Sequence, residues 1–310
     1  MRVVFMGTPD IAATCLERLL EAKLDVVAVY TKIDTPQNRG MKLTPSPVKQ
    51  VAMKAGIPVM QPTTFKNEAV VQQLRDLKPD VVAAVAYGKI LPKVVLDIPP
   101  MGCINIHASI LPQLRGSGPV QWAILRGLRE TGVTAMYMAP EMDTGDMIEI
   151  RRTPIDPEEN AQSLLDRLAD IGGDLLVDTL RRLEQGPVAA EKQDDAQATY
   201  APMLSKEMCP IDWEKTPQEI KDHIRGLDPW PVATMTLNGK RFRVYQAALT
   251  QKTTHAMPGT PLGVTKMGLE MACGGGGVLE VRVLQADGGK RMAAPDYFRG
   301  HPLSAPGGTQ

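Results

Sequence analysis

The chain has 310 residues, of which 43% are hydrophobic and 23% charged, and its 35 Lys and Arg residues are balanced by 35 Asp and Glu residues. This length suits two domains, and the zero net charge excludes a global attraction to nucleic acid or to a membrane surface, so any such surface must be local. No segment approaches the ~20 apolar residues of a membrane span, and the four cysteines are scattered without a Cys-x-x-Cys pair. We therefore expect a cytoplasmic protein without disulfides, without a structural zinc site and with no metal.

Short β-branched segments alternate with helical patterns over the first two thirds of the chain. The predicted strands are residues 3–6, 26–30, 58–60, 81–86, 103–108 and 133–138. This alternation predicts an α/β domain with a Rossmann-like, mostly parallel sheet. The turn after the first strand reads Gly7-Thr8-Pro9-Asp10 and lacks the glycines of a dinucleotide-binding turn, which disfavours a nicotinamide or flavin cofactor.

Residues 31–45 form a long connection after the second predicted strand. They contain Lys32, Arg39 and Lys42, with Asp34 as the only acid. Most connections in such sheets take about two to six residues. The segment is therefore either a solvated excursion of irregular structure or a flexible basic segment that becomes ordered on a phosphate-rich partner.

Polar side chains on the predicted strand 103–108 indicate an active site. Asn105 and His107 share one face of this strand, because successive strand side chains point to opposite faces. Ligands of open α/β sheets collect at the carboxyl ends of the strands. Asp143 follows the next predicted strand, and we expect it to face His107 because neighbouring strands of a parallel sheet end side by side.

The amide, imidazole and carboxylate together favour stabilisation of an oxyanion. A carboxylate orients and charges a neighbouring imidazole, and the N–H groups of Asn105 and His107 would hold negative charge that develops on oxygen. Taken singly, His107 could be a satisfied core histidine, Asn105 a hydrogen-bonding residue at a strand end, and Asp143 a turn aspartate. A Ser-His-Asp hydrolase is disfavoured, because Ser109 lies on the same strand end as His107 and the chain has no Gly-x-Ser-x-Gly turn.

The last third of the chain changes from helical patterns to strands and turns. Residues 158–185 predict one long helix, and residues 189–206 lose all periodicity. We therefore predict a catalytic domain over residues 1–188, a linker over 189–206 and a second domain over 207–310.

The second domain has two strong local signals. Thr216, Pro217 and Glu219 predict the start of a capped helix, and Asn238-Gly239 predicts a hairpin in a small all-β domain. Lys240, Arg241, Arg243 and Lys252 gather around this hairpin without an acid among them. They form either a solvated face or a set of phosphate contacts.

Several motifs of the chain resemble those of the folate-dependent formyltransferases. The resemblance rests on Asn105-Ile106-His107-Ala108-Ser109-Ile110-Leu111-Pro112, Arg115-Gly116 and Met142-Asp143-Thr144-Gly145. Further motifs are similar to those of the members of this family that act on methionyl-tRNA. These include Arg39-Gly40, Ala86-Tyr87-Gly88-Lys89-Ile90-Leu91-Pro92, Thr199-Tyr200-Ala201 and Pro229-Trp230-Pro231, so the resemblance covers essentially the whole chain.

The resemblance implies transfer of a formyl group from 10-formyltetrahydrofolate to the α-amino group of methionyl initiator tRNA, for translation initiation. The catalytic residues that it implies are Asn105, His107 and Asp143. Folate contacts are implied for Ser109, Ile110, Leu111, Pro112, Lys89, Ile90 and Leu91. Contacts to tRNA are implied for Arg39, Lys42, Lys240, Arg241 and Arg243, together with an oligonucleotide-binding type of β-barrel in the second domain.

Two alternatives remain open from the sequence. A formyltransferase acting on glycinamide ribonucleotide or on a nucleotide-linked amino sugar would share the trio, but would not be expected to carry both the Arg39 segment and the β domain. A non-enzymatic tRNA-binding protein would not need Asn105, His107 and Asp143. We expect a monomer with no membrane partner.

Overall fold

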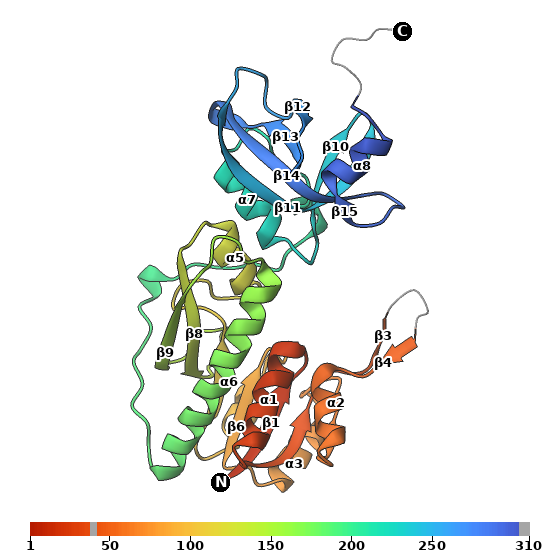
Figure 1. Ribbon diagram of the computed structural model, residues 1–310. Coiled ribbons are helices and arrows are strands. Elements are labelled where there is room, and N and C mark those ends of the chain that lie inside the picture. The colour runs from red at the N-terminus through yellow and green to blue at the C-terminus, as the bar shows by residue number, and fades with distance from the viewer. Residues whose placement is uncertain (38–41, 304–310) are drawn as a thin grey trace. The chain divides into compact units, whose positions relative to one another are not determined.

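The chain folds into two units (Figure 1), and each has its own hydrophobic core. The computed structural model describes residues 1–37 and 42–303. Unit 1 consists of residues 1–119, 130–154 and 165–201, and unit 2 of residues 120–129, 155–164 and 202–310. The units are thus interleaved along the chain, whereas the predicted domains are consecutive. The predicted boundaries stay a prediction.

Unit 1 is built on a seven-stranded sheet with the order β5-β2-β1-β6-β7-β8-β9. The pairings from β5 to β7 are parallel, and those of β7 with β8 and of β8 with β9 are antiparallel. This confirms the mostly parallel α/β sheet. The strands are β1 (Arg2–Gly7), β2 (Asp25–Tyr30), β5 (Val59–Met60), β6 (Val81–Val85), β7 (Cys103–His107), β8 (Glu130–Tyr137) and β9 (Met147–Pro154).

Helices cover both faces of this sheet. On one face, α6 lies against α1 and the sheet, since Gly173 lies against Cys15 and Arg18 and Gly172 against Ile106. On the other face, side chains of α3 and α4 pack on β1, β2, β6 and β7 in one hydrophobic cluster. The helices of unit 1 are α1 (Asp10–Glu21), α2 (Pro47–Lys54), α3 (Glu68–Asp76), α4 (Lys93–Leu96) and most of α6 (Ala161–Gln185), whereas α5 (Pro119–Leu125) falls almost entirely in unit 2.

The long connection after β2 contains regular structure. Strands β3 (Thr35–Gln37) and β4 (Lys42–Thr44) pair with each other in antiparallel fashion. The start of the segment is anchored by Asp34, whose carboxylate accepts hydrogen bonds from Lys49 at 2.7 Å and Gln61 at 2.8 Å. The excursion is therefore a partly structured arm rather than wholly irregular chain.

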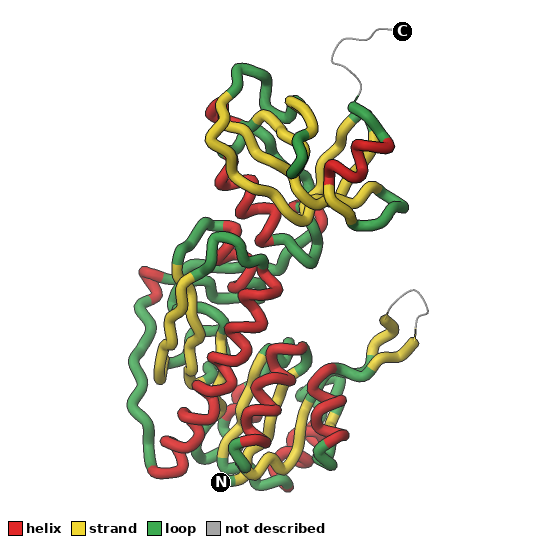
Figure 2. The backbone as a smooth tube through the Cα atoms, in the orientation of Figure 1, coloured by secondary structure: helices red, strands yellow, loops and turns green. Residues whose placement is uncertain are grey.

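The chain after α6 runs as an extended segment alongside β9 (Figure 2). It forms bridges between Glu191 and Met147 and between Tyr200 and Arg115. We call residues 189–201 the strap, because hydrogen bonds tie it to unit 1 at both ends. Most of the segment predicted as a linker is thus bound to unit 1.

Unit 2 contains a six-stranded sheet in which the strand order is β10-β11-β14-β13-β12, with β15 paired to β14, and all pairings are antiparallel. Its core combines sheet residues with α7 and α8, where Phe242 packs against Tyr297 and Phe298. This confirms a smaller β domain after the α/β domain. The elements are α7 (Pro217–Gly226), β10 (Ala233–Leu237), β11 (Lys240–Thr253), β12 (Pro261–Val264), β13 (Leu269–Ala272), β14 (Gly277–Ala286), β15 (Met292–Ala293) and α8 (Ala294–Gly300).

Both local signals of the second domain are confirmed. The Thr216 side chain accepts a hydrogen bond from the Glu219 backbone N–H, and the Glu219 carboxylate accepts one from the Thr216 backbone N–H, which is a complete capping box. Asn238 and Gly239 join β10 to β11 with φ values of +49° and +71°, as a tight hairpin requires. In the part of the chain that the structure describes, no helix is both long and apolar enough to cross a membrane.

Candidate active site

Strand β7 carries Asn105 and His107 on the face of the sheet that packs against α3 and α4. Cys103, on the same face of β7, belongs to the hydrophobic cluster formed with these helices. Asn105 is partly buried and His107 is 7% exposed. Each ring nitrogen of His107 has a hydrogen-bond acceptor near it.

The imidazole of His107 is held between a carbonyl and a carboxylate. Its Nε2 lies 3.0 Å from the Leu114 carbonyl oxygen, at hydrogen-bond distance, and its Nδ1 lies 3.6 Å from Asp143 Oδ2. The Asp143 side chain is only 13% exposed. The predicted convergence of His107 with Asp143 is therefore present in the structure, with the carboxylate slightly beyond direct hydrogen-bond range.

Asp143 reaches His107 by a different route from the one expected. Strand β8 runs antiparallel to β7, so its carboxyl end lies beside the start of β7, where Tyr137 pairs with Ile104. The loop after β8 brings Asp143 back, with φ at +57°, and Asp143 Oδ2 accepts a hydrogen bond of 2.9 Å from the Gly116 backbone. Aspartate tolerates this left-handed conformation better than most residues.

The backbone of this loop is held by the buried Gln193, which is held in turn by the buried Arg115. Gln193, on the strap, donates from Nε2 to the carbonyl oxygens of Asp143 and Gly145, both at 2.8 Å. Arg115 donates from Nε and Nη2 to Gln193 Oε1, at 3.0 and 2.8 Å. Sequence reasoning missed Gln193. The nearby motif Thr199-Tyr200-Ala201 was the available signal, since Thr199 accepts a hydrogen bond of 2.9 Å from the Leu114 backbone.

Two glycines permit the close approach of these loops. A Cβ at Gly116 would lie 2.7 Å from the Ala201 carbonyl oxygen, and its φ of +113° disfavours any other residue. A Cβ at Gly145 would overlap the Tyr137 carbonyl oxygen. Both the residue that donates to the Asp143 carboxylate, Gly116, and the residue two positions after Asp143, Gly145, must therefore be glycine.

The residues expected to contact folate lie in two loops. Ser109 and Leu111 are buried, and Ile110 and Pro112 are partly exposed. The Ser109 hydroxyl donates to the Gln113 carbonyl at 2.6 Å, so it stabilises the loop after β7. This engagement of its hydroxyl also weighs against Ser109 as a nucleophile.

The second loop follows β6, which pairs in parallel with β7, so both loops leave the same edge of the sheet. Ile90 is 73% exposed, whereas Leu91 is buried in the cluster below. Lys89 donates to the carbonyl oxygens of Pro62 and Thr63, at 2.8 and 2.6 Å, and this fixes the loop. The structure thus brings these residues to the sheet edge that carries His107, and their folate contacts stay a prediction.

Cys103 is the remaining nucleophilic side chain on this face of β7. Burial raises the pKa of its thiol to about 12, with the nearby Asp97 acting in the same direction. A thiol with this pKa is neutral at physiological pH. Cys103 is therefore a packing residue.

The residues expected to contact tRNA lie on two segments. Lys42 is on β4, and Arg39 lies outside the described residues. Lys240, Arg241 and Arg243 are exposed on β11, where Arg241 and Arg243 alternate with the buried Phe242. Lys252, grouped with them in the sequence, is paired with Glu270 at 2.6 Å, so the unpaired part of the basic group is smaller than expected.

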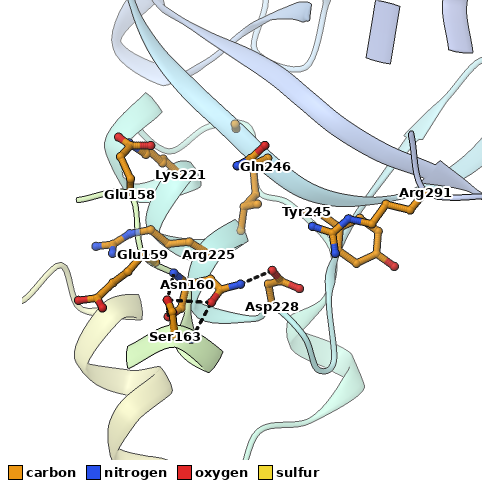
Figure 3. A pocket seen from close by; sticks show the side chains of 12 residues that line it. Glu158, Glu159, Asn160, Ser163, Lys221, Arg225, Asp228, Tyr245, Gln246 and Arg291 are labelled. Atoms are coloured by element: carbon orange, nitrogen blue, oxygen red, sulfur yellow. Dashed lines mark hydrogen bonds and ion pairs between the residues drawn. The ribbon is translucent and has the colours of Figure 1, made fainter. Parts of the chain in front are cut away.

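A separate pocket of about 270 Å³ lies within unit 2 (Figure 3). Its walls are mainly polar. Lys221 forms an ion pair with the lining Glu158, the Asn160 amide donates to the Asp228 carboxylate, and Arg225 pairs with Asp222 of the same helix. The residues of the predicted chemistry are not in this lining.

No group of three or more His, Cys, Asp or Glu side chains among residues 1–37 and 42–303 is arranged to hold a metal ion. The candidate site combines the imidazole of His107 and the carboxylate of Asp143 with the amide of Asn105, which shares the face of β7 with His107. Such a set is suited to acyl or formyl transfer, in which charge develops on a carbonyl oxygen.

Comparison with known proteins defines the class. Residues 1–180 match the family model described as formyl transferase, and residues 203–302 match that of the formyl transferase C-terminal domain. The chain belongs to the formyl transferase family, whose members are enzymes that use folate-derived formyl donors.

Individual relatives narrow this class. The chain is 47% identical over 304 residues to the methionyl-tRNA formyltransferase of Geotalea daltonii, covering 98% of this chain and 96% of that protein. Among solved structures, an N-formyltransferase from Helicobacter canadensis, in complex with folinic acid and dTDP-3-aminofucose, is 19% identical with a TM-score of 0.67, covering 90% of this chain and 98% of that one. HypX from Aquifex aeolicus, in complex with tetrahydrofolic acid, is 17% identical with a TM-score of 0.66. That match covers 96% of this chain and 47% of HypX, so the chain spans about half the length of HypX. These two likenesses concern the fold alone.

Proposed function

We propose that this chain transfers the formyl group of 10-formyltetrahydrofolate to the α-amino group of methionyl initiator tRNA. The observation that carries the proposal is the placement of His107 between Asp143 and a backbone carbonyl, in a chain 47% identical to a methionyl-tRNA formyltransferase. The sugar N-formyltransferase on the same fold is only 19% identical, which does not favour a sugar acceptor.

The reaction requires one bond to form and one to break. The free α-amino group attacks the formyl carbon, forming a carbon–nitrogen bond and pushing an electron pair onto the formyl oxygen. The tetrahedral intermediate then expels the donor nitrogen, which takes up a proton while the new amide loses one. Esterification lowers the pKa of the α-amino group, so a useful fraction is nucleophilic near neutral pH.

Asn105 and His107 supply the hydrogen bonds that this intermediate needs. The Asn105 amide and one N–H of a protonated His107 would donate to the oxyanion. In the structure Nε2 lies 3.0 Å from the Leu114 carbonyl oxygen and Nδ1 faces Asp143, so the Nε2–H would exchange the Leu114 carbonyl for the oxyanion when substrate binds. Catalytic hydrogen bonds commonly shorten only in the substrate complex, so the 3.6 Å to Asp143 is compatible with this role.

Asp143 would act as the counter-ion and proton carrier. Its carboxylate would stabilise a charged His107 ring and would receive the proton lost by the attacking amine. No covalent intermediate is required, since the donor is already an activated formyl group. Much of the remaining rate enhancement would come from alignment of the two bound substrates.

Folate and tRNA would bind to different segments of the chain. The loops at residues 89–91 and 109–112 leave the edge of the sheet beside His107, and the exposed Ile90 offers an apolar surface there for a ring. The basic arm at residues 31–45 would reach the acceptor end of initiator tRNA, where a weak or absent terminal base pair separates initiator from elongator. The phosphate backbone of the tRNA would be positioned by Lys240, Arg241 and Arg243. The reaction would take place in the cytoplasm, with a monomer as the active form.

The test compares formylation of initiator and elongator methionyl-tRNA by wild type, His107→Ala and Arg39→Ala. His107→Ala is expected to lose turnover on either acceptor, by roughly 10²–10³. Arg39→Ala is expected to weaken the initiator reaction selectively. A wild-type protein that formylates a nucleotide-linked amino sugar, but neither tRNA, would overturn the proposal. Full activity of His107→Ala would overturn the assignment of the chemistry.

A further inference from the structure

We propose that Gln193, a single buried residue of the strap, is a positioning residue for Asp143. This inference rests on the proposed function, because it assigns a role in the same reaction. Gln193 is 5% exposed and touches the Asp143 loop from a segment that the sequence predicts to be a linker. Its side-chain hydrogen bonds go to Arg115 and to the carbonyl oxygens of the Asp143 loop, so its effect would act through Asp143.

The side-chain amide of Gln193 has only one orientation that satisfies its neighbours. Arg115 can only donate hydrogen bonds, so the atom that it contacts at 3.0 and 2.8 Å must be the amide oxygen. The two carbonyl oxygens of Asp143 and Gly145 can only accept, so the atom 2.8 Å from each must be the NH₂ group. Both N–H donors of the NH₂ group therefore bind carbonyl oxygens of the Asp143 loop.

The clamp acts on a strained part of the loop. Asp143 has a φ of +57°, a conformation that costs a non-glycine residue free energy, and contacts with the surrounding structure must offset that cost. The clamp on its carbonyl fixes the peptide, and the 2.9 Å hydrogen bond from Gly116 fixes the carboxylate. Loss of the clamp would let the carboxylate drift away from His107 Nδ1.

Arg115 joins the two sides of this arrangement. Its guanidinium, 2% exposed, orients Gln193 and also pairs with Asp195 of the strap at 2.8 Å. Its backbone N–H donates to the Thr199 carbonyl and its carbonyl accepts from Ala201, at 2.8 and 2.7 Å. One residue thus ties the strap to the loop that also holds Leu114, the hydrogen-bond partner of His107.

Glutamate at position 193 gives the sharpest substitution. Gln193→Glu keeps the size of the side chain and retains an acceptor for Arg115, but places a carboxylate oxygen against two carbonyl oxygens. Gln193→Met removes the hydrogen bonds without adding a charge. Gln197→Ala, at an exposed position of the same strap, is the matched control.

The expected result is a fall in kcat of roughly 10-fold or more for Gln193→Glu and Gln193→Met, with KM for either substrate changed less than about 3-fold. Gln197→Ala should match wild type. A purely structural role would lower kcat by the same factor in any background. A positioning role predicts that Gln193→Met has little further effect on kcat once Asp143→Ala is present.

The outcomes separate this inference from the proposed function. Wild-type kcat in Gln193→Glu, or a full additional loss in the Gln193→Met/Asp143→Ala double variant, would overturn the positioning role while wild type still formylates methionyl-tRNA. Failure of wild type to formylate methionyl-tRNA would instead overturn the proposed function. Unfolding midpoints of all variants identify any loss that comes from misfolding.

Discussion

Asp143 Oδ2 lies 3.6 Å from His107 Nδ1, although the strand before Asp143 runs opposite to the strand that carries His107. The contact exists because the loop after β8 folds back and is held by Gly116 and Gln193. The distance between the two side chains is therefore set by hydrogen bonds to the Asp143 carboxylate and backbone. Substitutions of Asp143 should distinguish the effect of its charge on activity from the effect of its backbone conformation on stability.

Asp143→Asn is expected to lose activity without loss of stability. Asparagine tolerates the φ of +57° and keeps an oxygen for the Gly116 N–H, but it removes the negative charge beside His107. We expect kcat to fall roughly 10²-fold with an unchanged unfolding midpoint. Asp143→Ala should lower both, because alanine in the left-handed region costs about 1 kcal/mol. Equal unfolding midpoints for the two variants would contradict the backbone argument.

Asn105→Asp tests the amide as an oxyanion donor. The substitution keeps the size of the side chain but replaces its N–H donors with acceptors, so it should destabilise a developing oxyanion. We expect the single-turnover rate constant for formylation, measured with both substrates saturating, to fall by roughly 10²–10³. Thr236→Val, at an exposed position in unit 2, should leave the single-turnover rate unchanged. A rate for Asn105→Asp within about 3-fold of wild type would remove Asn105 from the chemistry.

The exposed basic residues of β11 should act through salt-dependent binding. Each of Arg241→Ala and Arg243→Ala is expected to raise KM for tRNA and to reduce the slope of log affinity against log salt by about 1, with kcat unchanged. Lys266→Ala, at an exposed turn of the same unit, is the control and should bind as wild type does. Wild-type salt slopes in both arginine variants would show that this face does not contact tRNA.

His223 should make unit 2 sensitive to acid. Burial lowers the pKa of His223 from its ordinary value of 6.5, opposed by a hydrogen bond to the Cys209 backbone, and Nε2 is buried without a hydrogen-bond partner. Nearby Lys215 lowers this pKa and Asp212 raises it. The unfolded chain therefore takes up a proton more readily than the folded one, and stability present above pH 6.5 is lost as the pH falls.

The measurement compares thermal unfolding at about pH 7.5 and about pH 5.5. His223→Gln should show a smaller drop in midpoint between the two conditions than wild type. His255→Gln, at an exposed position, should show the wild-type drop. An identical drop in His223→Gln would assign the acid sensitivity to other groups.

Features that depend on nearest neighbours could be predicted from the sequence. The Thr216 capping box, the Asn238-Gly239 hairpin and the shared face of Asn105 and His107 all follow from short-range backbone geometry, and the structure contains each of them. The alternation of strand and helix likewise predicts the α/β sheet correctly. Strand β9 was missed, because Glu149, Arg151 and Arg152 interrupt any apolar pattern on this edge strand.

The direction of β8, the path of the Asp143 loop and the attachment of the strap were decided by the tertiary structure. Gln193 meets the Asp143 carbonyl across 50 positions of sequence and Arg115 across 78, and no local pattern specifies such partners. The contacts of Lys252 and Lys240 could not be foreseen for the same reason, since Glu270 comes from another strand and Tyr297 from α8. Residue types and short-range spacing therefore indicated the candidate groups, whereas long-range hydrogen bonds determined how these groups are held together.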